Sequence, residues 1–281
     1  MTKIAVLMTC YNRVSTTLDC LRRLFAQEMP EGHLFDVWLV DDASPDKTGE
    51  KVRSVYPQVN VIEGTGGLFW SGGMRLAWKT AAVSDRYDYY LWLNDDVKLY
   101  DDALARLIHC EKMSHRDSII SGTLIDPNTG RMSYGCYGGS GLVFKNTNVP
   151  EEIKTGLYGN VVLISSRVFN RIGGMADGLV HQHGDFEYGY RARKNGIKVY
   201  AISPVGTCVA NYGFDRKKLF CMNIRERFDA LFSPKGIGIR DYCRYKYLTV
   251  GFLGAACSFA KGILTALLPR LMVNAQKGTG E

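Results

Sequence analysis

Short apolar segments recur along this chain, and several of them end abruptly in a polar or acidic cluster. KIAVLMT (3–9), FDVWLV (35–40) and YDYYLWL (87–93) are shorter than typical helices and read as strands buried on both faces. Segments with apolar residues on one helical face lie between them, so strands and helices alternate. This alternation predicts an α/β fold with an open sheet, flanking helices and right-handed crossovers.

The rest of the chain to residue 210 continues this pattern. The sequence between 121 and 150 is rich in Gly, Ser and Asn and predicts loops or a small hairpin. One helix is expected to be capped by Asp101 or Asp102, and another to be closed by Gly196. Helices are predicted over 15–28, 46–56, 72–83, 103–113 and 185–196, further strands over 60–64 and 198–202, and a strand leading into a helix over 158–169.

Composition and cysteine spacing limit the class of protein. Hydrophobic residues make up 46% of the 281 residues and charged residues 22%, which suits a sizeable core and argues against long disorder. No two of the eight cysteines have the C-x-x-C spacing, so we expect no structural zinc site and a reducing compartment. The first residues lack the features of a signal peptide, so the chain is expected to start in the cytosol and stay there.

Positive charge is concentrated at the end of the chain. Residues 211–281 hold 12 Lys and Arg against 5 Asp and Glu, whereas the preceding residues hold 23 of each. Such a basic tail indicates an anionic partner, or simply a solvated basic face. Within it, LTVGFLGAACSFA (248–260) is uncharged but shorter than the roughly 20 residues that span a bilayer. Binding to a lipid surface, packing on the domain and an oligomer contact all remain open for this segment.

Several common nucleotide-binding and hydrolase motifs are absent. The first strand-to-helix turn, TCYNRVS, has no G-x-G-x-x-G, and the chain has neither G-x-x-x-x-G-K-[ST] nor G-x-S-x-G. A nicotinamide or flavin site, a P-loop and a nucleophile elbow are therefore disfavoured. Polar clusters at Thr9–Arg13, Asp41–Asp42 and Asn94–Asp96 follow predicted strands, and ligands of open α/β sheets bind at that edge.

Two acidic motifs carry candidate chemistry. The carboxylates of LNDDV (93–97) suit a hard divalent cation that bridges to a diphosphate, although a solvated turn explains them as well. In GDFEYGYRARKNG (184–196), Glu187 and Arg191 are four residues apart and can form a structural ion pair. Asp185 stands at the helix entry, where it could cap the helix or act as a general base.

The order of the motifs is more specific than any one of them. TCYNR, VDDAS, LNDDV and GDFEYGYRARKNG occur in that order, with YGNVVLISSRVFNRIGGM (158–175) before the last. This order resembles family 2 glycosyltransferases of the GT-A fold over residues 3–210. GGLFWSGGMRLAW resembles bacterial rhamnosyl- or hexosyltransferases of cell-surface polysaccharide synthesis.

The resemblance implies roles for individual residues. Asp96 would bind Mn²⁺ or Mg²⁺, and Asp185 would be the catalytic base, with Glu187 and Arg191 as its supporting residues. Asp42 would read the pyrimidine edge of the nucleotide. The other residues that would line the nucleotide-sugar site are Thr9, Tyr11, Asn12, Arg13, Asp41, Gly67, Arg75, Asn94 and Asp95.

The chain departs from the family pattern in one place. Many GT-A enzymes have a metal-binding histidine some twenty residues after the base, where this chain reads VGTCVANYG. Cys208 or Asn211 could line the site there instead. His181 and His183, just before the base, could touch an acceptor or a phosphate, although a loop histidine is more often structural.

Taken together, the sequence predicts an inverting, metal-assisted glycosyltransferase with a catalytic domain over 1–212 and a helical, basic and apolar segment over 213–281. The resemblance implies a UDP- or dTDP-sugar donor and a glycan or lipid-linked acceptor. The expected location is the inner face of the cell membrane, with no nucleic-acid partner and possible homo-oligomer contacts through the C-terminal helices. A metal-dependent nucleotidyltransferase and a non-enzymatic basic membrane-binding protein are the alternatives.

Overall fold

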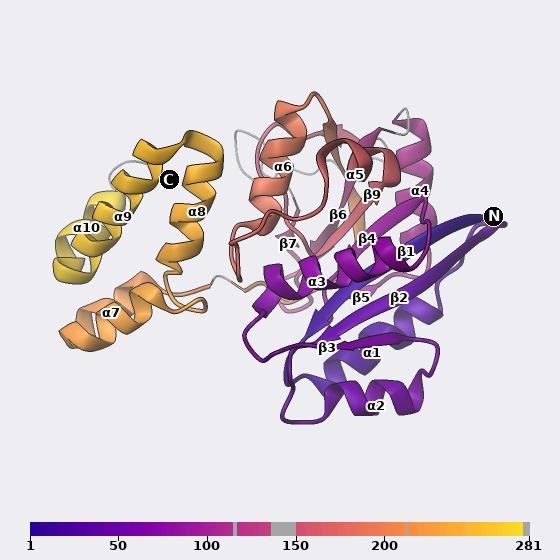
Figure 1. Ribbon diagram of the computed structural model, residues 1–281, viewed down its shortest axis with the longest axis horizontal. Helices are drawn as coiled ribbons and strands as arrows, with labels where there is room; N and C mark the ends of the chain where they lie inside the picture. Colours follow the sequence, from indigo (N-terminus) through magenta and orange to yellow (C-terminus); the bar gives the residue numbers. More distant parts are fainter. Residues whose placement is uncertain (115–116, 136–149, 212, 278–281) are drawn as a thin grey trace.

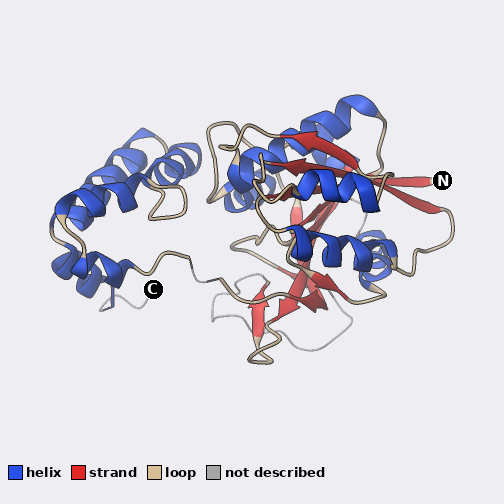
Figure 2. Ribbon diagram, turned by 90° about the horizontal axis from the view of Figure 1, so that it is seen from below, coloured by secondary structure: helices blue, strands red, loops and turns tan. Residues whose placement is uncertain are grey.

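A mixed sheet with helices on both faces forms the body of the protein, and a group of C-terminal helices lies to one side of it (Figures 1 and 2). The computed structural model describes residues 1–114, 117–135, 150–211 and 213–277. The predicted open α/β architecture with flanking helices and a helical extension is confirmed.

The sheet joins ten strands among the described residues, in the order β3-β2-β1-β4-β9-β6-β10-β5, with β7 beside β6 and β8 beside β10. Neighbours β3, β2, β1 and β4 are parallel, whereas β9 runs antiparallel to both β4 and β6. The strands are β1 (Thr2–Cys10), β2 (His33–Asp41), β3 (Asn60–Glu63), β4 (Tyr89–Leu93), β5 (Lys98–Leu99), β6 (Ser118–Ile125), β7 (Met132–Tyr134), β8 (Glu151–Glu152), β9 (Val161–Ser165) and β10 (Lys198–Thr207).

Two apolar layers enclose the sheet. One layer contains buried side chains of α1, α2 and α4, and the other contains buried side chains of α3, α5 and α6. Strand β4 is buried along its whole length because both layers cover it, which explains its unbroken apolar sequence. These helices are α1 (Val14–Phe25), α2 (Thr48–Val55), α3 (Phe69–Ser84), α4 (Ala103–Met113), α5 (Ser166–Ile172) and α6 (Gly184–Lys194).

Residues distant in sequence cap the starts of two helices, although α4 begins at Ala103 as predicted. The backbone N–H of Val14, at the start of α1, donates to Asp46 in the loop before α2. Asp102 occupies the N-cap position of α4, but the N–H of Leu104 donates to the side chain of Gln27. Non-local caps of this kind satisfy the same orphan donors as local ones.

Two other predictions can be compared with the structure. The predicted hairpin in the middle of the chain is formed by β6 and β7, while residues 136–149 of that Gly-rich segment lie outside the described residues. Gly196 follows α6 with φ of +72°, in the left-handed conformation expected of a glycine just beyond a helix end.

The C-terminal helices have a small core of their own. Leu231, Ile239 and Ala266 are buried together, and Phe228 and Ile263 pack against them. No helix among the described residues combines the length and the apolar character that crossing a membrane requires. The segment consists of a 3₁₀ helix (Arg216–Cys221), α7 (Ile224–Phe232), α8 (Ile239–Val250), α9 (Phe252–Leu267) and α10 (Pro269–Lys277).

Candidate active site

The carboxyl ends of β1, β2 and β4 meet at one edge of the sheet. These strands are parallel neighbours, so the residues that follow them come close together. Arg13 after β1 forms an ion pair with Asp95 and Asp96 after β4, and its Nη1 atom is 3.1 Å from an oxygen of each. The structure thus brings two of the predicted polar clusters into direct contact.

Asp95 and Asp96 differ in their surroundings. Asp95 is 4% exposed, and it also accepts a hydrogen bond from the hydroxyl of Thr17 at 3.2 Å. Burial raises the pKa of Asp95 to about 6, and the neighbouring Arg13 opposes this increase. Asp96 is more accessible, with 36% of its side chain exposed, and its Oδ1 lies 3.6 Å from the thiol of Cys208. Asp96 is therefore the member of the pair that a ligand can reach.

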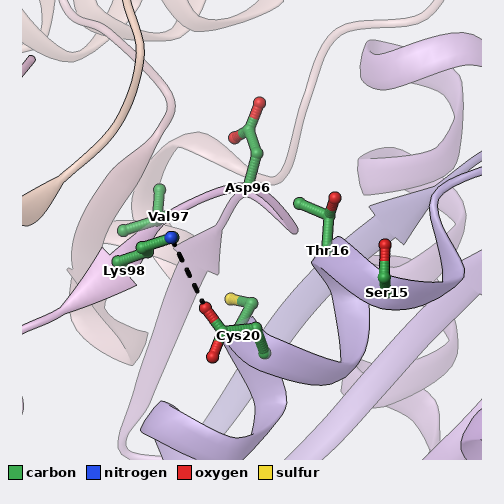
Figure 3. Close-up of a pocket in the computed structure, with 7 residues that line it drawn as sticks. Ser15, Thr16, Cys20, Asp96, Val97 and Lys98 are labelled. Carbon is green, nitrogen blue, oxygen red and sulfur yellow. Dashed lines mark ion pairs between the residues drawn. The ribbon is translucent and has the colours of Figure 1, made fainter. Parts of the chain in front are cut away.

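A hollow of about 220 Å³ lies beside Asp96, between α1 and the start of β5 (Figure 3). In Figure 3 the Asp96 carboxylate points away from Lys98, and Lys98 forms an ion pair with Asp19 at 3.9 Å. The lining residues are Ser15, Thr16, Asp19, Cys20, Asp96, Val97 and Lys98.

The two acids after β2 hold the loops around them. Asp42 accepts backbone hydrogen bonds from Gly66, Leu68 and Phe69 at 2.8–2.9 Å, which shapes the turn before α3. Asp41 accepts from the N–H of Gly49 at 2.9 Å and from Ser44. Both carboxylates are thus engaged by the protein, and a role for Asp42 toward a nucleotide base remains a prediction.

The remaining residues predicted to bind the donor lie in different settings. Thr9 is the second-to-last residue of β1 and packs against Gly73 so closely that a Cβ at that glycine would clash with it. Tyr11 is exposed, with the Lys235 ammonium 5.4 Å from its ring centroid. Asn12 adopts a left-handed φ of +55°. Gly67 has open space around it.

Arg75 is directed away from the acidic edge. Its guanidinium donates to the carbonyl oxygens of Ala176 and Leu179 at 3.0–3.1 Å and pairs with Asp177 at 3.2 Å. In this arrangement Arg75 stabilises the loop that precedes Asp185, and the structure does not bring it to Asp95 or Asp96.

Asp185 lies at the start of α6 in a tight backbone cradle. Its carboxylate accepts from the N–H groups of Gly159 at 2.9 Å and Phe186 at 2.8 Å. A Cβ at Gly159 would lie 3.3 Å from Asp185 and would collide with the ring of Trp70, so the three residues are in contact. Burial raises the pKa of Asp185 to about 6.

Trp70 connects this carboxylate to the acidic edge. Its indole N–H donates to Oδ1 of Asn94 at 2.7 Å, while its ring lies against Gly159 and edge-on to Trp92. Asn94 immediately precedes Asp95 and Asp96. The candidate base and the candidate metal ligand therefore belong to one continuous set of contacts.

Buried Glu187 and half-buried Arg191 form an ion pair further along α6. Glu187 is 3% exposed and binds Arg191 through two contacts of 2.8 and 3.0 Å. Arg191 also donates to the carbonyl oxygens of Ile172 and Gly174. The pair fixes α6 to the segment after α5, which agrees with the structural explanation of its i, i+4 spacing.

The loop before Asp185 is held by the C-terminal segment. Asp241 in α8 is buried, and its carboxylate accepts from the backbone N–H groups of Val180, His181 and Gln182 at 2.7–3.1 Å. His183 stacks on a tyrosine of α8 with ring centroids 5.2 Å apart, and burial lowers its pKa to about 4. His183 is therefore neutral near physiological pH.

The donor set at the acidic edge fits a divalent cation only in part. Among the described residues, no group of three or more His, Cys, Asp and Glu side chains is placed to hold a metal ion. Burial raises the pKa of the Cys208 thiol, which disfavours the thiolate that binds metals. Asp96 supplies accessible carboxylate oxygens, and Mg²⁺ or Mn²⁺ commonly binds one or two carboxylates together with substrate phosphates. These residues fit a cation whose coordination the donor diphosphate would complete.

The site contains residues that sequence reasoning missed. Gly159 and Asp241 had no predicted role, and Trp70 reads from sequence as a residue that could stack on a sugar but is more often part of the core. One signal was available for Asp241, since it is the only acid between residues 230 and 280. Cys208, proposed as a lining residue in place of the absent histidine, does lie beside Asp96.

Comparison with known proteins places this geometry in a family. The sheet, its helices and the acidic edge define a protein of the GT-A fold class. The family model for glycosyl transferase family 2 matches residues 5–159, and the chain belongs to that family.

Solved structures share the fold at low sequence identity. S. aureus TarS 1–349 superposes with a TM-score of 0.57 and 15% identity, over 95% of this chain and 75% of that one. The same TarS fragment in complex with UDP-GlcNAc gives a TM-score of 0.54 and 14% identity, over 95% and 76% of the two chains. The mannosyltransferase PcManGT from Pyrobaculum calidifontis, solved with GDP-Man and Mn²⁺, gives 0.54 and 17%, over 98% and 79%. No curated protein matches this chain.

Proposed function

We propose that this protein is an inverting glycosyltransferase that moves a hexosyl or deoxyhexosyl group from a UDP- or dTDP-sugar to an acceptor hydroxyl. One observation carries the proposal: Trp70 joins the Asp185 cradle to Asn94, directly before Asp95 and Asp96. A base and a cation-binding carboxylate in one connected site are what sugar transfer from a nucleotide diphosphate needs.

Asp185 is the proposed general base. It would accept the proton of the acceptor hydroxyl as that oxygen attacks the anomeric carbon, while the bond to the diphosphate breaks and its electron pair leaves with the diphosphate. A pKa of about 6 keeps Asp185 ionised near neutral pH and leaves it basic enough to take a proton. A single displacement of this kind inverts the anomeric centre, so no second carboxylate nucleophile is needed.

The diphosphate would be bound at the acidic edge. Asp96 would hold Mn²⁺ or Mg²⁺, and the cation would neutralise charge on the leaving diphosphate. Two of the similar structures were solved with Mn²⁺, PcManGT and GalNAc-T7, which supports this assignment. Arg13 sits between Asp95 and Asp96 and is a second source of positive charge beside the diphosphate.

The rest of the donor would lie along the ends of β1 and β2. Thr9, Tyr11 and Asp42 are the proposed contacts to the nucleotide base, with Asn12, Asp41 and Gly67 beside them. Asn94 and Asp95 would face the ribose or the sugar. The complex of TarS with UDP-GlcNAc supports a UDP-type donor, since that protein shares this fold.

The acceptor and the location follow from the end of the chain. We propose that residues 1–212 form the catalytic unit and that residues 213–281 bring it to a lipid-linked or surface-polysaccharide acceptor at the cytoplasmic face of the membrane. The excess of seven positive charges in residues 211–281 supports an anionic surface as the partner.

A thermal-shift panel tests the donor assignment. UDP-, dTDP- and GDP-sugars are each added with Mn²⁺ or with a chelator, and the unfolding midpoint is measured. We expect a UDP- or dTDP-sugar to raise the midpoint in Mn²⁺, because a ligand that binds the folded state stabilises it. If no nucleotide sugar shifts the midpoint in either condition, the proposed donor class is wrong.

A further inference from the structure

Helix α9 presents a broad exposed face without a charged residue. Phe252 and Leu253 at its start are 73% and 77% exposed, and exposed apolar side chains continue to its end. At 3.6 residues per turn these positions cover about 160° of the helix surface. The face consists of Phe252, Leu253, Ala256, Cys257, Phe259, Ala260, Leu264 and Leu267.

The opposite face of α9 already forms its contacts within the protein. Gly262, Thr265 and Ala266 are buried there, and a Cβ at Gly262 would lie 2.6 Å from Ile239 of α8. Figure 1 shows α8 between α9 and the sheet. The exposed face is therefore left over after α9 has packed, and its side chains are not part of a core within the described residues.

The charge around this face is mainly positive: from the start of α7 to the end of α10, residues 224–277 hold nine Lys and Arg against three acids, Glu226, Asp229 and Asp241. The 39 residues from Tyr242 to Gly280 contain no Asp or Glu but five Lys and Arg: Arg244, Lys246, Lys261, Arg270 and Lys277. Lys261 is exposed and follows the α9 face directly, and Arg270 is exposed at the start of α10. Two members of the face itself, Phe252 and Phe259, are aromatic.

We propose that the exposed face of α9 is a docking surface for a bilayer with anionic headgroups, in which the helix lies parallel to the membrane plane. An uncharged helical face of about 24 Å, with Lys261 at its edge and Arg270 just beyond the end of the helix, matches the acyl boundary and the phosphate layer above it. A second copy of the chain is a poorer match, because pairing the α9 faces would bring two sets of like charges together.

The docking surface deepens the proposed function. It rests on that proposal, because membrane docking serves the enzyme only if the acceptor is lipid-linked or membrane-bound. It would place the Asp185 site beside the membrane, since α8 connects α9 to the loop before Asp185. Docking is nevertheless measurable without donor or acceptor, so its test is independent of the transferase activity.

Vesicle flotation of the full chain tests the docking surface. The protein is mixed with vesicles of phosphatidylcholine alone, or with added phosphatidylglycerol, and the bound fraction is measured at low and high salt. The test variant is Phe252→Ser with Leu253→Ser. The matched control is Val83→Ser with Met113→Ser, which removes two apolar side chains that are 80% and 66% exposed on the catalytic body.

We expect the wild type and the control to bind anionic vesicles, with weaker binding at high salt. The Phe252–Leu253 variant should lose about tenfold or more in partitioning for each side chain removed. All three proteins should share one unfolding midpoint and one midpoint shift with donor, because these side chains are exposed.

Three outcomes would overturn the docking surface. The first is wild-type protein that does not bind anionic vesicles, and the second is a Phe252–Leu253 variant that binds them as well as the control does. The third is a dimer in solution that this variant dissociates, without vesicle binding by either protein, which would make α9 an interface between copies. A wild type that binds vesicles but gives no donor-induced midpoint shift would refute the proposed function and leave the docking surface standing.

Discussion

Replacing Asp185 with Asn should affect the transfer rate and the stability of the protein in different ways. In the folded protein burial raises the pKa of Asp185 from an ordinary value of 3.8 to about 6. Ionised Asp185 therefore destabilises the fold above pH 6, and the shift corresponds to about 3 kcal/mol. The asparagine removes this cost, but its single carbonyl oxygen can accept from only one of the Gly159 and Phe186 N–H groups. The lost hydrogen bond costs about 1–3 kcal/mol, so net stability at pH 8 should stay level or rise by up to about 2 kcal/mol.

The rate of transfer should respond very differently. Loss of a general base typically lowers the rate by about 10²–10⁴-fold, while donor binding at the acidic edge should persist. In the wild type, kcat/KM should fall about tenfold for each pH unit below about 6, because protonated Asp185 cannot accept the acceptor proton. Residual activity of the variant should lack this dependence.

The assays are single-turnover transfer from pH 5 to 8, donor titration by calorimetry, and denaturant unfolding at pH 5 and 8. Glu187→Gln is the matched comparison on the same helix. It weakens the ion pair between buried Glu187 and half-buried Arg191 and should cost about 1–3 kcal/mol of stability. Normal turnover by Asp185→Asn, or an unchanged acidic limb in its pH profile, would refute the base assignment. A stability loss as large as that of Glu187→Gln would refute the pKa argument.

Three further substitutions test neighbouring parts of the site. Asp96→Ala should weaken UDP binding in Mn²⁺ but not in chelator, and equal loss in both conditions would argue against metal ligation. Gly159→Ala should lower the transfer rate and destabilise the protein by about 1–3 kcal/mol, because the new methyl group collides with Trp70. Unaltered activity and an unaltered unfolding midpoint would contradict this close contact. Asp241→Asn should lower kcat more than it changes donor affinity, because the loop before Asp185 loses acceptors for its N–H groups, whereas a loss confined to donor affinity would place its effect elsewhere.

The sheet was predictable from sequence because its strands are locally distinct. Strand β4 is buried on both faces, and burial of that kind leaves an unbroken apolar segment in the sequence. The polar residues at strand ends were predicted to share one edge, and Arg13 does contact both Asp95 and Asp96. Because these strands are parallel neighbours, their carboxyl ends must lie at the same edge of the sheet.

Partners that are distant in sequence could not be predicted in the same way. Asp46 caps α1 from 32 residues away, and Gln27 accepts from the first turn of α4 from 77 residues away, although Asp102 holds the predicted N-cap position of α4. Arg75 has the charge to bind a diphosphate, but its direction depends on the loop at 176–179, which its own sequence neighbourhood does not specify. The apolar character of α9 was visible in the sequence, whereas which of its faces stays exposed depends on where α8 packs.

The boundary predicted at residue 212 cuts through the support of the candidate base. Asp241 lies beyond that boundary and accepts three hydrogen bonds from residues 180–182, and the hydroxyl of Tyr190 in α6 donates to the Thr249 carbonyl at 2.8 Å. A buried carboxylate that loses its donors, or donors that lose their carboxylate, costs more than a surface contact. The C-terminal helices therefore contribute to the geometry of the site as well as to the surface that α9 exposes. One short helix, α8, therefore links the docking surface on α9 to the loop that positions Asp185.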